Sequence, residues 1–197
     1  MSIAQPKSLT LEEFLHYDDN TDTRYELEDG VLIAMGAESP LNTWIAVFLI
    51  LAFRDLGLAI DRFGLKHLLQ VDSYHVTARD PDLIIHSEQS AAALDDGRKE
   101  SCLRLSDPTP LIVVEIVSPG PETSDNYKRD YDRKPKEYAA RGIPEMWQVD
   151  ATRNWVRVGT LTDGTYHFTT FQGSDRIQSP TFPSLDLTAA AILHAGR

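Results

Sequence analysis

A strand with a carboxylate in its middle dominates the pattern of this chain. Residues 111–117 are β-branched or apolar at every position except Glu115. A run that is apolar on both faces is typical of a strand in the middle of a sheet, covered by other elements on each side. An ionised carboxylate destabilises such a position unless it is paired or bound to a cation. Two interpretations of Glu115 are open. It is a glutamate at the end of the strand whose side chain reaches solvent or pairs with an arginine, or it is part of a charged site.

A second carboxylate opens another short apolar strand. Asp82 lies in Pro81-Asp82-Leu83-Ile84-Ile85, and on its own it could be a turn residue, because Asp favours strand entries. Together with Glu115 it makes a pattern of carboxylates on two strands of one sheet. Such a pair can share a hard cation such as Mg²⁺ or Mn²⁺. The cation would polarise a phosphodiester and lower the pKa of an attacking water.

A lysine near the metal would complete a hydrolytic site, because it can orient water and offset the charge that develops on phosphorus. The candidates are Lys128, Lys134 and Lys136. Lys134 and Tyr138 are i, i+4 neighbours, so Lys134 can point toward the apolar side on which Tyr138 lies. Pro135 requires the helix to begin near Asp132. The alternative is that all three lysines are solvated.

Glu26 is a further candidate, in a hairpin strand that precedes Asp29-Gly30. Leu27 lies on the opposite face of that strand. Glu26 is a metal or water ligand, or it belongs to the exposed face of an edge strand.

Composition indicates a soluble protein of the cytoplasm. The chain has 197 residues and one cysteine, Cys102, which excludes an intrachain disulfide and a cysteine-based zinc site. Its longest apolar run, Trp44 to Phe53, is too short to span a bilayer. The N-terminus shows no signal-peptide pattern. We expect no membrane contact.

The charge of the chain argues against nucleic-acid binding, because phosphate contacts need Lys and Arg. Net charge is −11. One segment is an exception, since five basic residues lie within nine positions: Lys128, Arg129, Arg133, Lys134 and Lys136.

Periodicity and turn residues predict helices alternating with short strands, which is typical of an α/β or α+β fold with helices on the faces of a sheet. The length favours a single domain, residues 1–197. Helices are predicted over 10–17, 39–56, 131–141 and 187–194. Strands are predicted over 58–63, 67–76, 81–85, 111–117, 146–150, 155–161 and 166–171, with a hairpin over 24–35 and a polar, irregular excursion over 87–108.

These motifs together resemble the Uma2 family of the PD-(D/E)XK nuclease superfamily. The similar segments span residues 9–193 and are Arg24 to Gly30, Pro81-Asp82-Leu83, Val114 to Glu122, Lys134 to Trp147, Val149-Asp150 and Phe182 to Leu185. The resemblance implies a restriction-endonuclease-like core, a central mixed sheet flanked by helices with additional strands.

The resemblance also implies a site. Asp82 and Glu115 correspond to the superfamily aspartate and glutamate, and Glu26 to an upstream glutamate. The lysine expected two residues after Glu115 is replaced by Val117 and is moved to the following helix, at Lys134. The implied activity is a Mg²⁺-dependent endonuclease acting on DNA, with Asp82 and Glu115 on the metal and Lys134 assisting the attacking water.

Two other functions compete with this interpretation. A catalytically silent domain of the same fold would bind a partner or nucleic acid, which suits the acidic balance and the displaced lysine. A small-molecule hydrolase ranks last, because no Gly-x-Ser-x-Gly or His-Glu-x-x-His motif occurs. Aromatic strands around Trp147, Trp155 and Phe171, together with the resemblance, predict a homodimer.

Overall fold

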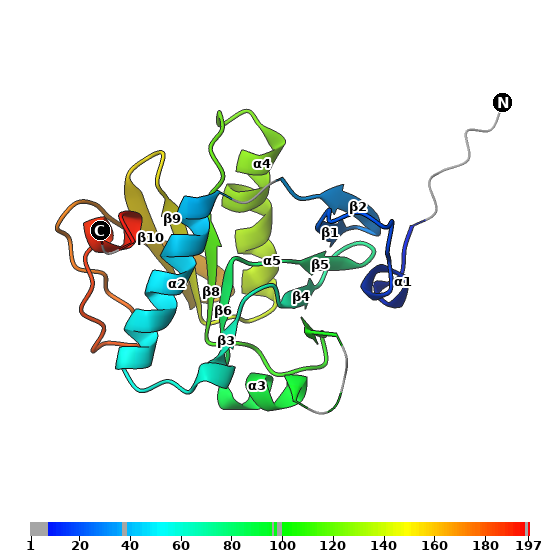
Figure 1. Cartoon of the computed structure of the whole chain (residues 1–197), viewed down its shortest axis with the longest axis horizontal. Coiled ribbons are helices and arrows are strands. Elements are labelled where there is room, and N and C mark those ends of the chain that lie inside the picture. The colour runs from blue at the N-terminus through cyan, green and yellow to red at the C-terminus, as the bar shows by residue number, and fades with distance from the viewer. Residues whose placement is uncertain (1–7, 37–38, 96, 98–99, 196) are drawn as a thin grey trace.

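A six-stranded mixed sheet forms the centre of the protein. It is described here from a computed structural model covering residues 8–36, 39–95, 97, 100–195 and 197 (Figure 1). The strand order is β11-β10-β9-β8-β6-β3; β8 and β9 are parallel and the other pairs are antiparallel. The strands are β3 (Phe63–Gly64), β6 (Leu83–Ile85), β8 (Ile112–Ile116), β9 (Glu145–Asp150), β10 (Trp155–Thr162) and β11 (Thr165–Phe171). The predicted central strand is thus confirmed, since β8 lies between β6 and β9.

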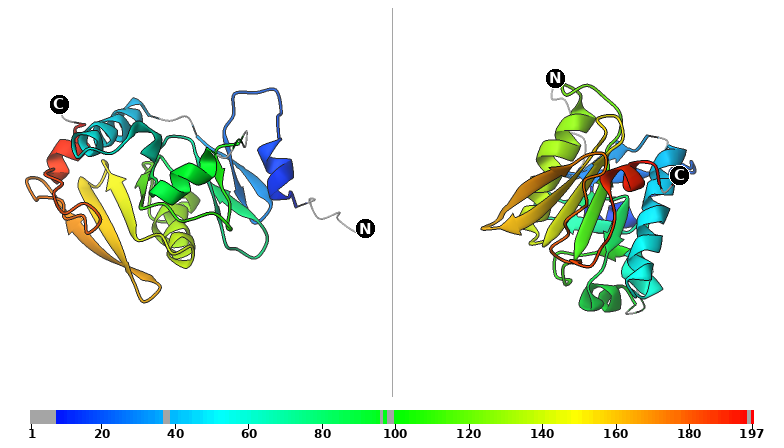
Figure 2. Two further views of the ribbon diagram at one scale, coloured as in Figure 1. Left: turned by 90° about the horizontal axis from the view of Figure 1, so that it is seen from below. Right: turned by 90° about the vertical axis from the view of Figure 1, so that its left-hand side faces the viewer.

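Helices cover both faces of this sheet, as the end-on view in Figure 2 shows. One face packs on α2 (Pro40–Asp55) and α6 (Ala189–Leu193), and the other on α5 (Lys134–Ala140). The residues of β8 alternate between them: Ile112, Val114 and Ile116 face α2, and Val113 faces α5. Glu115 consequently falls on the α5 side.

A smaller sheet packs beside the first, with strand order β2-β1-β5-β4-β7. Its strands are β1 (Tyr25–Glu28), β2 (Val31–Ala34), β4 (Leu68–Val71), β5 (Thr77–Arg79) and β7 (Cys102–Leu103). Helix α1 (Leu11–Leu15), with a complete Thr10–Glu13 capping box, supplies Phe14 to its core. The chain passes from β5 of this sheet to β6 of the large sheet through Asp80-Pro81-Asp82, which places two carboxylates at the junction.

The remaining elements correct several predictions. The expected strand over 58–63 is the 3₁₀ turn η1 (Ile60–Arg62) followed by β3. The expected strand over 67–76 is the shorter β4, and the rest of that segment is a turn that leads into β5. The excursion over 87–108 contains α3 (Glu88–Leu94) and β7. Its polar residues sit at the helix start, where Ser87 caps the first turn.

The helix predicted over 131–141 begins earlier. Capped by Ser124, it runs as α4 (Asp125–Lys128), a π-helical turn η2 (Arg129–Arg133) and α5. The prediction placed its start near Asp132 because Pro135 cannot supply an N–H to the preceding turn. A wide π turn just before Pro135 accommodates the missing hydrogen bond instead. Such turns are rare and occur frequently at functional sites.

Among the described residues, no helix combines the length and apolar character needed to cross a bilayer. The aromatic rings behind the homodimer prediction do not form a free surface. Trp147 is fully buried and Phe171 is 5% exposed, both in the core cluster under α2. Trp155 packs on the ring of Tyr131.

Candidate active site

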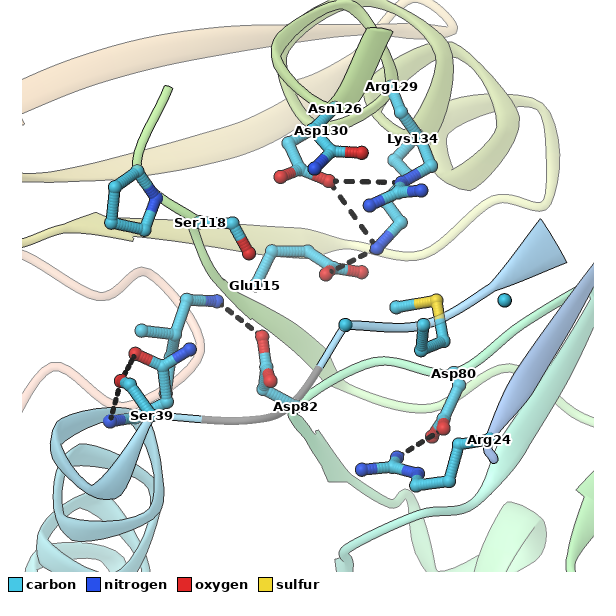
Figure 3. Close-up of a pocket in the computed structure, with 16 residues that line it drawn as sticks. Arg24, Ser39, Asp80, Asp82, Glu115, Ser118, Asn126, Arg129, Asp130 and Lys134 are labelled. Carbon is cyan, nitrogen blue, oxygen red and sulfur yellow. Dashed lines mark hydrogen bonds and ion pairs between the residues drawn. The ribbon is translucent and has the colours of Figure 1, made fainter. Parts of the chain in front are cut away.

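A cavity of about 180 Å³ lies where the two sheets, α2 and the α4–η2–α5 helix meet (Figure 3). It is lined by side chains from five separate stretches of sequence. Those used below are Arg24, Ser39, Asn42, Asp80, Asp82, Glu115, Ser118, Asn126, Arg129, Asp130 and Lys134. Three of the four residues singled out from sequence therefore line one cavity: Asp82, Glu115 and Lys134.

Glu115 projects from β8 toward α5 and is 3% exposed. One carboxylate oxygen accepts a hydrogen bond from the Lys134 ammonium at 2.7 Å, and the other from the Tyr138 hydroxyl at 2.6 Å. Burial raises the pKa of Glu115, Lys134 opposes this, and the negative charges of Asp130 and Glu26 add to it, giving a pKa of about 7. The strand-end alternative is thus wrong: Glu115 reaches a lysine inside the protein.

Asp82 stands beside Glu115 on the neighbouring strand. Leu83 pairs with Val114, so the same antiparallel register sets Asp82 opposite Glu115, where side chains project to a common face. The Ile116 N–H donates to the Asp82 carboxylate at 2.6 Å. This bond orients the Asp82 carboxylate, which lines the cavity below Glu115 in the view of Figure 3.

Lys134 is the buried one of the three candidate lysines. Lys128 is exposed, and Lys136 is 75% exposed and pairs with Asp132 at 2.6 Å. Lys134 is 2% exposed, as its i, i+4 relation to Tyr138 predicted.

The ammonium of Lys134 serves three carboxylates at once. Its Nζ lies 2.7 Å from Glu115, 3.3 Å from Glu26 and 3.6 Å from Asp130. Burial alone lowers the pKa of Lys134, but these three carboxylates outweigh it and raise the pKa well above its ordinary value. Glu115 shares this one ammonium with two other carboxylates. Burial therefore still raises the pKa of Glu115 although the residue is paired.

Glu26 is buried, with no exposed surface, because β1 lies between β2 and β5 rather than at the sheet edge. The exposed-edge alternative is therefore wrong. Burial raises the pKa of Glu26, but the positive charges of Lys134, Arg79 and Arg129 outweigh burial and lower this pKa to about 2. Glu26 is thus an ionised carboxylate surrounded by cations at the back of the site.

Sequence reasoning missed four charged residues of this site: Arg79, Asp80, Arg129 and Asp130. Arg79 is fully buried and holds two further carboxylates, Glu28 at 2.8 Å and Glu137 at 2.6 and 2.7 Å. A signal for Asp80 exists in Asp80-Pro81-Asp82, since residues i and i+2 of an extended chain face the same side. Asp80 pairs with Arg24, and burial raises its pKa.

The carboxylates of the site suit a divalent metal that takes few protein ligands. Among the residues that the structure describes, no group of three or more His, Cys, Asp or Glu side chains could hold a metal ion. Mg²⁺, however, usually keeps several waters and binds through one or two carboxylates together with substrate phosphates. The neighbouring carboxylates of Asp82 and Glu115 suit this way of binding Mg²⁺. Each Glu115 oxygen accepts one hydrogen bond and has a second lone pair that could bind a cation.

Fold and site together define a mixed α+β protein with a buried carboxylate–lysine cluster beside the central strand β8. The chain belongs to the Uma2 family, described as "Putative restriction endonuclease", whose sequence profile matches residues 11–190. The family match supports a nuclease function.

Solved structures agree with this fold. One is the crystal structure of "a putative nuclease belonging to DUF820 from Anabaena variabilis ATCC 29413", which covers 96% of this chain and 99% of its own with a TM-score of 0.71 at 16% identity. That likeness shows the restriction-endonuclease-like fold. No curated protein sequence matches the chain.

Proposed function

We propose that the chain is a Mg²⁺- or Mn²⁺-dependent endonuclease that hydrolyses phosphodiester bonds of DNA, built as one domain over residues 1–197. The observation that carries the proposal is the buried Lys134 ammonium held between Glu115 and Glu26 at the edge of a cavity that Asp82 also lines. Such a grouping of acids with one lysine is expected where charge develops during hydrolysis.

Asp82 and Glu115 would hold the metal ion. When bound, the ion supplies polarisation of the phosphodiester and a lower pKa for an attacking water. Glu115 has a pKa of about 7, so near neutral pH it is only partly ionised in the protein without metal. Its oxygens become available to a cation as the pH rises past 7.

Lys134 assists as a charged donor. With its pKa raised above the ordinary value, it stays protonated at every working pH. It can therefore orient the attacking water and offset the charge that forms on the phosphoryl oxygens, but it cannot take the proton of that water. Glu26 and Asp130 act on Lys134, since they hold the ammonium in place when Glu115 turns toward a cation.

The test compares wild type with Glu115→Gln, purified identically and assayed on DNA with Mg²⁺ and with EDTA. Glu88→Gln is the matched control, because Glu88 is 86% exposed and lies outside the cavity. We expect Glu115→Gln to abolish the Mg²⁺-dependent cleavage and Glu88→Gln to retain it. Equal cleavage by wild type and Glu115→Gln would refute the proposal and leave the silent binding domain, which the net charge of −11 favours.

We also propose a homodimer in the cytoplasm that leaves the cavity open to solvent. Trp44, Val47 and Leu51 of α2 are exposed apolar residues, whereas Trp147 and Phe171 of the aromatic strands are buried. Light scattering should give twice the chain mass of 22.1 kDa. A mass of 22.1 kDa over a wide concentration range would exclude the dimer.

A further inference from the structure

Two buried arginines of the site differ sharply in their hydrogen bonds. Arg79 makes four, to Glu26, Glu28 and twice to Glu137. Arg129, whose side chain is 7% exposed, makes none to any described residue. Its Nε lies 3.6 Å from Asp130 and 3.9 Å from Glu26, beyond hydrogen-bond distance.

The buried Nε of Arg129 has ion-pair contacts with Asp130 and Glu26 but no hydrogen bond to a described residue, and the side chain lines the cavity. Arg129 lines it beside Lys134, and Figure 3 shows its terminal nitrogens between the α4–η2 helix and Glu115. A buried donor without an acceptor destabilises a fold. Buried polar groups without a hydrogen bond are rare in folded proteins, and a ligand that binds there is one explanation for such a group. Here the missing partner is an acceptor that enters the cavity.

The opposite wall of the cavity also favours a negative charge. Ser39 and Asn42, from the start of the 16-residue helix α2, line it. The N-terminus of a helix attracts anions through its dipole and its free N–H groups. In α2, Pro40 has no N–H and the Asn42 N–H donates to the Ser39 hydroxyl, so the attraction depends mainly on the dipole. No acidic residue lies in the first turn of α2, so no carboxylate of that turn already meets this charge.

We propose that Arg129 and the N-terminus of α2 form a phosphate-binding subsite that holds the substrate phosphate at Asp82 and Glu115. The inference rests on the proposed function and adds the residues that anchor the anion. The guanidinium fork matches two phosphate oxygens at once. The guanidinium would give a phosphodiester a local positive partner in a chain of net charge −11, inside a cavity that also holds Asp80, Asp82, Glu115 and Asp130.

The experiment titrates inorganic phosphate into the full chain by calorimetry, once with Mg²⁺ and once with EDTA. The variants are Arg129→Met and Arg129→Lys. Arg157→Met is the matched control, because Arg157 lies on β10 over the rings of Trp155 and Phe168 and outside the cavity. We expect Arg129→Met to weaken phosphate binding at least tenfold, Arg129→Lys to weaken it less, and Arg157→Met to bind like wild type.

A second variant separates anion binding from folding. Asn42→Asp places a negative charge at the start of α2, which stabilises a helix, and its carboxylate can still accept the hydrogen bond that Ser39 donates to Asn42. We expect an unchanged or higher melting temperature together with weaker phosphate binding. Phosphate binding equal to wild type in Arg129→Met, or no binding by wild type with Mg²⁺ and with EDTA, would overturn the subsite.

The phosphate titration tests the subsite and the cleavage assay tests the endonuclease proposal, so either proposal can be refuted without the other. If Glu115→Gln abolishes cleavage while Arg129→Met binds phosphate normally, the endonuclease proposal stands and the subsite falls. If Arg129→Met loses phosphate while Glu115→Gln cleaves like wild type, the anion subsite stands and the catalytic proposal falls.

Discussion

The two faces of the central sheet are built from alternate residues of the same strands, yet they differ in kind. Toward α2, Ile112, Val114 and Ile116 of β8 pack in a continuous apolar core. Toward α5, the apolar core ends after Val113, and Glu115 meets Lys134 and Tyr138. The first face is stabilised by removing apolar surface from water. The second is stabilised by ion pairs between buried charges, in which Glu115 shares the Lys134 ammonium with Glu26 and Asp130.

This difference predicts that the loss of folding stability caused by a substitution depends on pH on the α5 face but not on the α2 face. Apolar packing has no titrating group, so its contribution is the same at every pH. The ionic face changes with pH through each carboxylate whose pKa differs between the folded and unfolded states. Substitutions on each face test that contrast.

Lys134→Met should destabilise the fold by about 3–5 kcal/mol at pH 8, because Glu115, Glu26 and Asp130 lose their shared cation. The loss should be smaller at pH 5 than at pH 8, because Glu115, with a pKa of about 7, is largely protonated at pH 5. Urea unfolding at pH 5 and pH 8 measures it, with Lys136→Met as the exposed control. A loss independent of pH would mean that Lys134 contributes by packing alone.

Ile112→Ala, on the apolar face of the same strand, should cost about 2–5 kcal/mol through lost burial and a residual cavity. Its effect should be equal at pH 5 and pH 8. The site residues remain in place, so we expect DNA cleavage below the melting temperature to persist. A strong pH dependence of this loss would show that the two faces are not independent.

Glu115→Gln should stabilise the metal-free protein above pH 7. The pKa of Glu115 rises from 4.5 to about 7 on folding, so wild type loses stability as the pH rises from 4.5 to 7, and the variant does not. The difference has an upper limit of about 3 kcal/mol, since one pKa unit equals about 1.4 kcal/mol. Gln retains an oxygen for Lys134 and can donate to the Tyr138 oxygen. Equal stability of the two proteins from pH 4.5 to 8 would contradict the raised pKa.

Tyr138→Phe should cost about 1–3 kcal/mol at pH 8, because its hydroxyl donates to an ionised carboxylate. Tyr166→Phe is the matched control on the same face, since the Tyr166 hydroxyl donates to the neutral carbonyl of Ile143 at 2.7 Å. We expect the control to lose only about 0.5–1.5 kcal/mol. Equal losses at pH 8 would indicate that Glu115 is protonated there.

Local pattern predicted a large part of the fold. The β1–β2 hairpin is present, with positive φ at Asp29 and Gly30, and so are β8 and α2 with proline in its first turn. The errors fall where a tertiary contact decides. β3 has two residues and exists because β6 offers it a partner, and the π turn before Pro135 lies in a helix packed on the sheet.

Three features of the site can be read from the chain alone: the buried strand that contains Glu115, the acidic strand entry at Asp82, and the spacing of Lys134 from Tyr138. They depend on periods of two and of about 3.6 residues, which are visible among neighbours along the chain. The position of Glu26 behind Lys134, and the different hydrogen bonding of Arg79 and Arg129, are set by contacts between distant segments. Glu26 and Lys134 lie on β1 and α5, far apart in sequence. Because electrostatic energy depends on distance and burial in three dimensions, no local pattern carries that information.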